Sequence, residues 1–356
     1  MKAIILLISL TTIFCTSPLL KVENGQSLSE YELLELFEDS TEIENYFSQA
    51  HFETFKKNVE KIIEHNSNPR KTYTQGVNKF TFMTDEEFEG FYLGASQNCS
   101  ATKKSNIQFK KFAPPSYWDW RNVSNVSYVS PVKNQGKCGS CWTFSTTGAI
   151  ESHYSLLRNV TPPSLSEQQL VDCAQAFDNF GCRGGLPSHA FEYIKYNGGL
   201  EFESNYTYQA KDGVCKFNSS LPNIKVNSGA VNITMGDEVE LRDALFEFGP
   251  ISITYQVVSD FRNYKSGIYE STVCRNGTMD VNHAVLAVGY GRLNGTDYWI
   301  VKNSWGAEWG DQGYFKIKRG VNMCGVAVCN SFPNLNSTHH HNHFTTSSSG
   351  FLKYIQ

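Results

Sequence analysis

The residues with the clearest capacity for chemistry lie in one stretch, Gln135-Gly136-Lys137-Cys138-Gly139-Ser140-Cys141-Trp142. A helical pattern follows from Thr143 to Leu157, and one buried face is expected from Trp142, Ile150, Tyr154 and Leu157. A cysteine at the start of a helix can be activated as a thiolate, because exposed N–H groups and the helix dipole favour an anion there. The same Cys-x-x-Cys spacing is also typical of a redox pair or of half a zinc site.

Two residues far along the chain can complete a nucleophilic site. A thiol nucleophile needs a base, a group that orients the base, and donors for the oxyanion. His283 opens the run His283-Ala284-Val285-Leu286, and Asn303 lies in Lys302-Asn303-Ser304-Trp305-Gly306. A histidine at a strand edge is on its own more often structural, so the catalytic interpretation depends on all three residues together.

These motifs resemble those of the papain-like cysteine protease family. His283 lies 142 positions after Cys141, within the roughly 130–150 positions typical of that family, and Asn303 lies slightly beyond, at 162 positions. The resemblance implies an α+β fold of two lobes: a helical lobe that carries the nucleophile and a strand-rich, barrel-like lobe. An active-site cleft is expected between them, and a helical propeptide before them.

The resemblance also implies a role for each residue. Cys141 is the expected nucleophile, His283 the base and Asn303 the group that orients it, while Gln135 and the backbone N–H of Cys141 form the oxyanion hole. Cys141 and His283 are expected as a thiolate–imidazolium pair, with the pKa of the thiol lowered to roughly 3–4. No metal and no cofactor is expected. Substrate contacts are expected from Gly185, Leu186, Pro187, Ala284, Trp305 and Thr102, although Gly184 to Pro187 also fits an ordinary turn.

The ten cysteines sharpen this interpretation. Eight remain once Cys15 is assigned to a signal peptide and Cys141 to catalysis, and spacing alone does not choose their pairing. The resemblance implies three disulfides, Cys138–Cys182, Cys173–Cys215 and Cys274–Cys324. The two cysteines that remain, Cys99 and Cys329, would then tether a short peptide called a mini-chain to the enzyme, as in cathepsin H-type members of the family.

The chain is expected to divide into six segments. Met1-Lys2 and the apolar run 3–14 resemble a signal peptide. A helix-prone region from Leu28 to Asn66 carries part of the family's propeptide motif, Phe55-x-x-Asn58-x-x-x-Ile62-x-x-x-Asn66, although Phe47, His51 and Phe82 depart from the family pattern. The expected segments are a signal peptide (1–17), a propeptide (18–96), the mini-chain (97–102), an excised linker (103–112), the catalytic domain (113–335) and a disordered tail rich in Ser, Thr and His (336–356).

Composition points to the secretory pathway and excludes nucleic-acid binding. The net charge of -4 and the lack of a basic stripe argue against a nucleic-acid partner. No apolar run reaches the roughly 18 residues that a membrane span needs. We expect a lysosome, a comparable acidic vacuole or the extracellular space, because the chain has a signal-like start and many Asn-x-Ser/Thr sequons. These sequons are at Asn98, Asn122, Asn125, Asn159, Asn205, Asn218, Asn232, Asn276, Asn294 and Asn336.

Specificity is expected to depend on the mini-chain. A free carboxylate at Thr102 would pair with the α-ammonium group of a substrate and block longer chains, which makes an aminopeptidase with some endopeptidase activity. The expected partners are peptide and protein substrates, the protein's own propeptide and cystatin-like inhibitors, and the expected state is a monomer. The alternatives are an endopeptidase that loses the mini-chain and a catalytically silent papain-like binding protein.

Overall fold

The computed structural model describes residues 17–40, 48–94, 98, 113–335, 344–346 and 352–354. The chain divides into two compact units, residues 1–84 and residues 85–356. The signal peptide up to residue 16, the linker 103–112 and all of the mini-chain except Asn98 lie outside the described residues.

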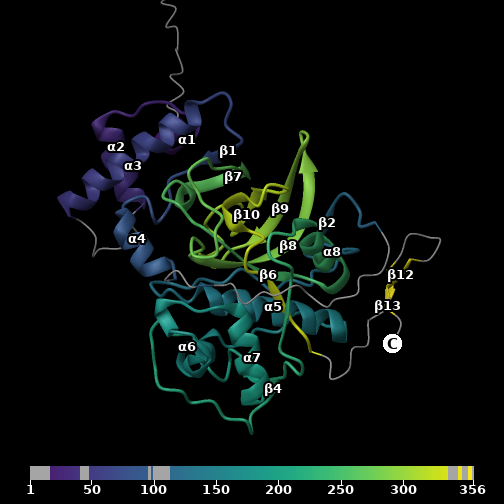
Figure 1. Cartoon of the computed structure of the whole chain (residues 1–356). Helices are drawn as coiled ribbons and strands as arrows, with labels where there is room; N and C mark the ends of the chain where they lie inside the picture. The colour runs from purple at the N-terminus through teal and green to yellow at the C-terminus, as the bar shows by residue number, and fades with distance from the viewer. Residues whose placement is uncertain are drawn as a thin grey trace, which may run out of the picture. The chain divides into compact units, whose positions relative to one another are not determined.

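The first unit is helical (purple to blue in Figure 1). It contains α1 (Pro18–Glu23), α2 (Glu30–Ser40), α3 (Gln49–Ser67) and the short strand β1 (Tyr73–Gln75). The Ser48 side chain caps α3 by accepting a hydrogen bond from the His51 N–H, and α3 ends two residues before Pro69. Apolar side chains of α2 and α3 form the core, namely Leu33, Leu36, Phe37, Phe55, Val59 and Ile62.

Two buried asparagines of the propeptide motif tie α3 to the chain around it. Asn58 Nδ2 donates to the Thr81 carbonyl (2.8 Å). Asn66 Nδ2 donates to the carbonyls of Val22 (3.0 Å) and Gln75 (2.9 Å), and its Oδ1 accepts from the Gln75 N–H (3.0 Å). A buried backbone group without a partner costs about 1–3 kcal/mol, so these two positions need an amide side chain.

The second unit contains the longest buried helix, α5 (Cys141–Arg158), and the neighbouring helices α6 (Glu167–Cys173) and α7 (Pro187–Asn197). Pro187 occupies the first turn of α7 and Leu186 its N-cap. The fixed φ of proline suits the first helical position. The unit also contains α4 (Asp85–Tyr92), α8 (Glu238–Phe248) and the 3-10 turns η1 (Gln175–Phe177), η2 (Gly181–Arg183), η3 (Phe261–Asn263) and η4 (Met323–Gly325).

The strands of the second unit form an open sheet in the order β7–β10–β9–β8–β6–β11–β5, with β2 paired to β8. This path does not close on itself, so the lobe is strand-rich as expected but is not a closed barrel. The sheet strands are β2 (Trp118–Asp119), β5 (Ala230–Asn232), β6 (Ile251–Tyr255), β7 (Tyr264–Tyr269), β8 (His283–Leu293), β9 (Thr296–Lys302), β10 (Tyr314–Lys318) and β11 (Ser331–Pro333).

Two small ladders lie outside this sheet. β3 (Leu200–Glu201) pairs with β4 (Asn223–Ile224), and β12 (Phe344–Thr346) pairs with β13 (Leu352–Tyr354). The second ladder lies in the tail.

Helix α5 lies between the sheet on one side and α6 and α7 on the other (Figure 1). It is buried nearly all round, whereas Tyr154 and Leu157 are only half-buried. The expected single apolar face is therefore wrong, because both lobes pack on this helix. Its polar residues are accommodated by hydrogen bonds, as when Ser145 Oγ donates to the Val285 carbonyl of β8 (2.7 Å).

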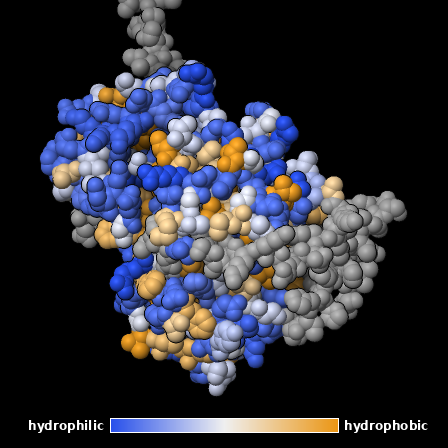
Figure 2. Space-filling view, viewed as in Figure 1, coloured by the Kyte–Doolittle hydropathy of each residue, from blue (hydrophilic) through white to orange (hydrophobic). Residues whose placement is uncertain are grey.

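Three disulfides join Cys138 to Cys182, Cys173 to Cys215 and Cys274 to Cys324. They are the three pairs that the resemblance implied. In the part of the chain that the structure describes, no helix is long and apolar enough to cross a membrane. On the face drawn in Figure 2, hydrophobic residues lie in small groups among hydrophilic ones across the described surface.

Candidate active site

Cys141 is the first residue of α5 and is 3% exposed. Ser140 is the N-cap residue, and the Ala284 N–H points at the Cys141 sulfur with a separation of 3.5 Å. Backbone N–H groups from the helix start and from β8 therefore surround the sulfur, an arrangement that favours an anion.

Strands β8 and β9 bring His283 and Asn303 together. His283 is the first residue of β8, Asn303 follows the last residue of β9, and the two strands are antiparallel neighbours. His283 Nε2 lies 2.8 Å from Asn303 Oδ1, which also accepts from the Ser304 N–H (2.8 Å). Because Oδ1 only accepts, Nε2 carries the proton of this bond. The ring of Trp305 covers the pair at 4.8 Å from the imidazole centroid.

The Gln135 side chain is fully buried and held at both ends. Its Oε1 accepts from Ser304 Oγ (2.7 Å), which fixes which way the amide points. Its Nε2 donates to the carbonyls of Cys138 (2.9 Å) and Tyr92 (3.0 Å). Two carbonyl oxygens therefore accept from this amide while residues 85–94 cover the site.

One small pocket of about 20 Å³ lies beside the sulfur. Its lining includes the expected residues Gly185, Leu186 and Ala284, whereas Pro187 is buried at the start of α7 and does not line it. Sequence reasoning missed other lining residues, which are Gly94, Thr254, Val281 and Asn282. The expected contact Thr102 lies outside the described residues.

Gly185 is required by internal packing. A Cβ atom there would lie 2.5 Å from Asn179 Oδ1 and 2.6 Å from the Trp142 ring. The Leu186 N–H next to it donates to the same Asn179 Oδ1 (2.9 Å). Glycine therefore lets this wall of the pocket lie flat against the residue that follows the nucleophile.

Residues 85–94 pass through the site. The Phe88 ring lies edge-on against Trp305 (5.4 Å), the Tyr92 carbonyl accepts from Gln135, and the Gly94 N–H donates to the Asn282 carbonyl (3.0 Å). The segment thus extends from Trp305 to the pocket that Gly185 lines. Sequence reasoning placed these residues in the propeptide but did not predict which site residues they contact.

This covering changes the expected protonation of the site. Burial raises the pKa of the Cys141 thiol to about 11, although nearby backbone N–H groups oppose the shift. Burial lowers the pKa of His283 to about 4, opposed by the hydrogen bond to Asn303. Burial therefore shifts both pKa values toward the neutral thiol and the neutral imidazole in this form, and the thiolate–imidazolium pair stays a prediction for the enzyme without the covering segment.

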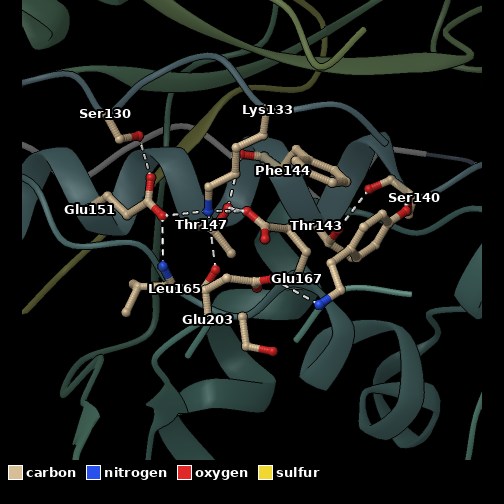
Figure 3. Close-up of polar contacts among 12 residues, drawn as sticks. Ser130, Lys133, Ser140, Thr143, Phe144, Thr147, Glu151, Leu165, Glu167 and Glu203 are labelled. Atoms are coloured by element: carbon tan, nitrogen blue, oxygen red, sulfur yellow. Dashed lines mark hydrogen bonds and ion pairs between the residues drawn. The ribbon is translucent and has the colours of Figure 1, made fainter. Parts of the chain in front are cut away.

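A buried charge network lies under the site, and sequence reasoning missed it (Figure 3). Lys133 Nζ lies 2.9 Å from Glu151 Oε1 and 2.7 Å from Glu167 Oε1. Lys302, next to Asn303, donates to Ser130 Oγ (2.9 Å), and Ser130 donates to Glu151. The available signal was Glu151 itself, a charged residue within a helix that has few others.

Tyr208 was also missed. Its hydroxyl donates to the Gln135 carbonyl (2.7 Å) and lies 2.6 Å from Ser140 Oγ. It thereby joins the two chain segments that carry the predicted oxyanion donors. Among the described residues, no group of three or more His, Cys, Asp or Glu side chains could hold a metal ion, and the histidine tract at 339–343 lies outside them.

Comparison with known proteins adds two family matches. Residues 114–334 match the papain family cysteine protease domain, and residues 44–88 match the cathepsin propeptide inhibitor domain (I29).

Individual relatives are similar over most of their length. Cysteine proteinase 3 of Solanum lycopersicum is 56% identical over 284 residues, which are 79% of this chain and 78% of that protein. Pro-cathepsin H of Bos taurus is 49% identical over 291 residues, 82% of this chain and 84% of the relative. The solved structure of digestive procathepsin L 3 of Tenebrio molitor superimposes with a TM-score of 0.77 at 37% identity, covering 87% of this chain and all of the other.

Proposed function

Because the chain belongs to the papain family of cysteine proteases and carries the family's propeptide inhibitor domain, we propose that it is the zymogen of a cysteine aminopeptidase. The proposed enzyme keeps some endopeptidase activity and works in a lysosome or comparable acidic vacuole reached through the secretory pathway. Residues 85–94 lie across the candidate site, as an inhibitory segment must.

The proposed reaction is acyl transfer. His283 Nε2 is hydrogen-bonded to Asn303, whereas His283 Nδ1 has no hydrogen-bond partner among the described residues. The proton of Cys141 therefore passes to Nδ1. The thiolate attacks the peptide carbonyl, and the oxyanion is held by Gln135 Nε2 and the Cys141 N–H. His283 then protonates the leaving amine and later activates water, which hydrolyses the thioester.

The observation that carries the aminopeptidase proposal is the position of Cys329. It packs in one buried cluster with Leu186, Val281 and Val328, and Leu186 and Val281 also line the pocket beside Cys141. A peptide bound to Cys329 through Cys99 would therefore lie at this end of the cleft. Its terminal carboxylate, at Thr102, would bind the α-ammonium group of a substrate and exclude further residues.

A paired assay tests this proposal. The activated enzyme is given matched peptides with a free or an acetylated N-terminus, and we expect the free peptides to be cleaved much faster. Cys99→Ala, which removes the tether without changing the buried cluster, should lower that preference while cleavage of acetylated peptides persists. Equal rates on both peptides in the unmodified enzyme would instead indicate an endopeptidase without the mini-chain.

Two measurements separate the remaining cases. An epoxide thiol inhibitor should label the activated enzyme and fail to label Cys141→Ala, whereas a silent binding protein would not be labelled at all. Mass spectrometry of the mature protein with disulfides intact should find a peptide containing Cys99 attached through Cys329. A mature protein that lacks this peptide would contradict the mini-chain.

A further inference from the structure

Arg262 is a buried cation at the Trp305 end of the cleft. It belongs to η3, and its side chain is 2% exposed. Its backbone carbonyl accepts from Trp309 Nε1 (2.8 Å), and the ring of Phe261 beside it lies 6.0 Å from the Trp305 ring. Arg262 is therefore fixed on the same aromatic wall that covers His283.

The segment that crosses the cleft presents a carboxylate to this arginine. Asp85 Oδ1 lies 3.0 Å from Arg262 Nη2, and the guanidinium carbon lies 5.6 Å from the centre of the Phe88 ring. Burial lowers the pKa of Arg262. Four carboxylates of the covering segment oppose this shift; the effect of Asp85 is the largest of the four, followed by Glu89, Glu86 and Glu87. A guanidinium removed from water is costly unless an anion pairs with it, so acidic residues suit this position.

The course of residues 85–94 shows which part of a substrate would meet Arg262. Asp85 and Phe88 lie at Arg262 and Trp305, Tyr92 lies at Gln135, and Gly94 lies in the pocket with Gly185 and Cys141. The proposed function assigns the Gly185 end to the N-terminal residue of the substrate. Arg262 then lies on the opposite side of the nucleophile, where the leaving part of the peptide binds.

We propose that Arg262 forms a subsite for an acidic side chain on the C-terminal side of the scissile bond, a role that rests on the proposed peptidase function. Once residues 85–94 leave the cleft, Arg262 loses the carboxylate of Asp85. A substrate Asp or Glu restores a charge-assisted pair at the same guanidinium. The inhibitory segment and the preferred substrates thus present the same chemical group to one residue.

The test compares kcat/KM of the activated enzyme on peptides that differ only in Glu or Gln, placed in turn at the first, second and third positions after the scissile bond. At one of these positions we expect Glu to be favoured about tenfold, as for a charge-assisted hydrogen bond worth about 1.4 kcal/mol. In Arg262→Gln the Glu/Gln ratio at that position should fall to about one. In Arg262→Glu a peptide with Lys should become the preferred one.

Three results would overturn the proposal. The first is a ratio near one at all three positions in the unmodified enzyme. The second is a tenfold ratio that survives Arg262→Gln. Should Arg262→Gln fail to fold, the third is a tenfold ratio that survives the neutral variant Arg262→Met. Cleavage of the Gln peptides and labelling of Cys141 are measured in parallel. An enzyme active on Gln peptides without a preference for Glu contradicts only this proposal, whereas an enzyme inactive on every peptide contradicts the proposed function.

Discussion

Tyr208 holds both sides of the proposed oxyanion hole. Its hydroxyl bonds to the Gln135 carbonyl on one side and to Ser140, the residue before the nucleophile, on the other. Its ring packs edge-on against Phe144 at 5.0 Å. It touches no reacting atom, so it acts as a positioning residue.

We predict that Tyr208→Phe lowers kcat about tenfold with little change in KM, because the donors of the oxyanion hole lose a shared anchor while the substrate pocket is unaltered. Tyr206→Phe is the matched control, since its hydroxyl bonds to Asp172 instead (2.8 Å). The control should lose stability by about 1 kcal/mol and keep its kcat. Equal kcat losses in the two variants would contradict a positioning role.

The protonation of Cys141 should depend on whether residues 85–94 cover it. In the zymogen, burial raises the pKa of the thiol to about 11, so the thiol is protonated at every physiological pH. Once the segment leaves, water and the helix dipole stabilise the thiolate and its pKa falls. We predict that iodoacetamide alkylates Cys141 of the mature enzyme down to about pH 5, where imidazolium can still pair with the thiolate.

In the intact zymogen, alkylation of Cys141 should rise only at alkaline pH. The measurement is the rate of carbamidomethylation of the Cys141 peptide, followed by mass spectrometry at short times. The intact mass of the zymogen is verified at each pH. Identical pH profiles for zymogen and mature enzyme would show that the covering segment does not set the pKa of this thiol.

Phe88 of helix α4 anchors the covering segment against Trp305. The Phe88 ring is 1% exposed, packs edge-on against Trp305 at 5.4 Å and stacks with Tyr92 at 5.8 Å. Phe91 on the same helix is 40% exposed and meets the Lys137 ammonium at 5.4 Å from its ring centre. Two phenylalanines three residues apart therefore differ in burial and make a matched pair.

We predict that Phe88→Ala raises the fraction of zymogen with an open cleft about 150-fold, because about 3 kcal/mol of buried aromatic packing is lost. The measurement is the rate at which an epoxide inhibitor labels Cys141 in freshly purified zymogen. Phe91→Ala should change that rate less than threefold. Comparable acceleration by both substitutions would mean that α4 does not hold the segment through Phe88.

The local elements of the site were largely predictable. In the sequence, apolar runs bounded by glycines and turn residues mark β8, β9 and β10, and one antiparallel hairpin then suffices to place His283 beside Asn303. Helix α5 was also found, but its burial was not. Periodicity reports one apolar face, and nothing local shows that a second lobe will cover Thr143 and Thr147 as well.

Contacts between distant segments were not predictable. The hydroxyl of Tyr208 reaches Gln135 across 73 positions, and Lys302 reaches Ser130 across 172. Such contacts depend on how the lobes pack, which spacing along the chain does not encode. The pKa shifts of Cys141 and His283 in the covered site were not predictable for the same reason, because burial by residues 85–94 is a tertiary property.

At the scale of the catalytic unit, charged side chains join the two lobes under the site. Lys133 lies between Glu151 of α5 and Glu167 of α6, and Lys302 extends from the end of β9. Burial and the charge of Glu151 raise the pKa of Glu167 to about 7, while Lys133 opposes that shift. Glu151 is buried too, which by itself would raise its pKa. The charges of Lys133 and Lys302 outweigh this effect and keep the pKa of Glu151 below its usual value.

This network should make stability depend on pH through Glu167. Its pKa is raised in the folded state from 4.5 to about 7, so the folded chain holds a proton that the unfolded chain releases. Protonated Glu167 thus adds about 3 kcal/mol to the free energy of unfolding. This stabilisation is fully present below about pH 4.5 and is lost as pH rises through 7. Two buried histidines have the opposite effect on stability. Burial lowers the pKa of His153 and His283 to about 4, so the free energy of unfolding falls as pH drops below about 6.5.

A comparison of variants isolates the term due to Glu167. Glu167→Gln stays neutral at every pH, and its oxygen can still accept from Lys133 and Thr147, whose bonds to Glu167 are 2.7 and 2.6 Å. We compare the unfolding free energy of this variant with that of the protein that keeps Glu167. We predict that the difference shifts in favour of the variant by about 3 kcal/mol as pH rises from 4.5 to 7.5. Both proteins carry Cys141→Ala to prevent self-digestion.

Urea unfolding followed by tryptophan fluorescence measures this difference. The signal reports on the second compact unit, because all six tryptophans lie within residues 85–356. Glu203→Gln is the matched control, since Glu203 lies half-buried with one oxygen bonded to the Tyr208 N–H (2.8 Å). Burial raises the pKa of Glu203 as well, without a lysine bonded to it, so a smaller gain is expected there. A free-energy difference for Glu167→Gln that stays constant from pH 4.5 to 7.5 would mean that Glu167 is ionised throughout, with Lys133 and Lys302 together neutralising both carboxylates.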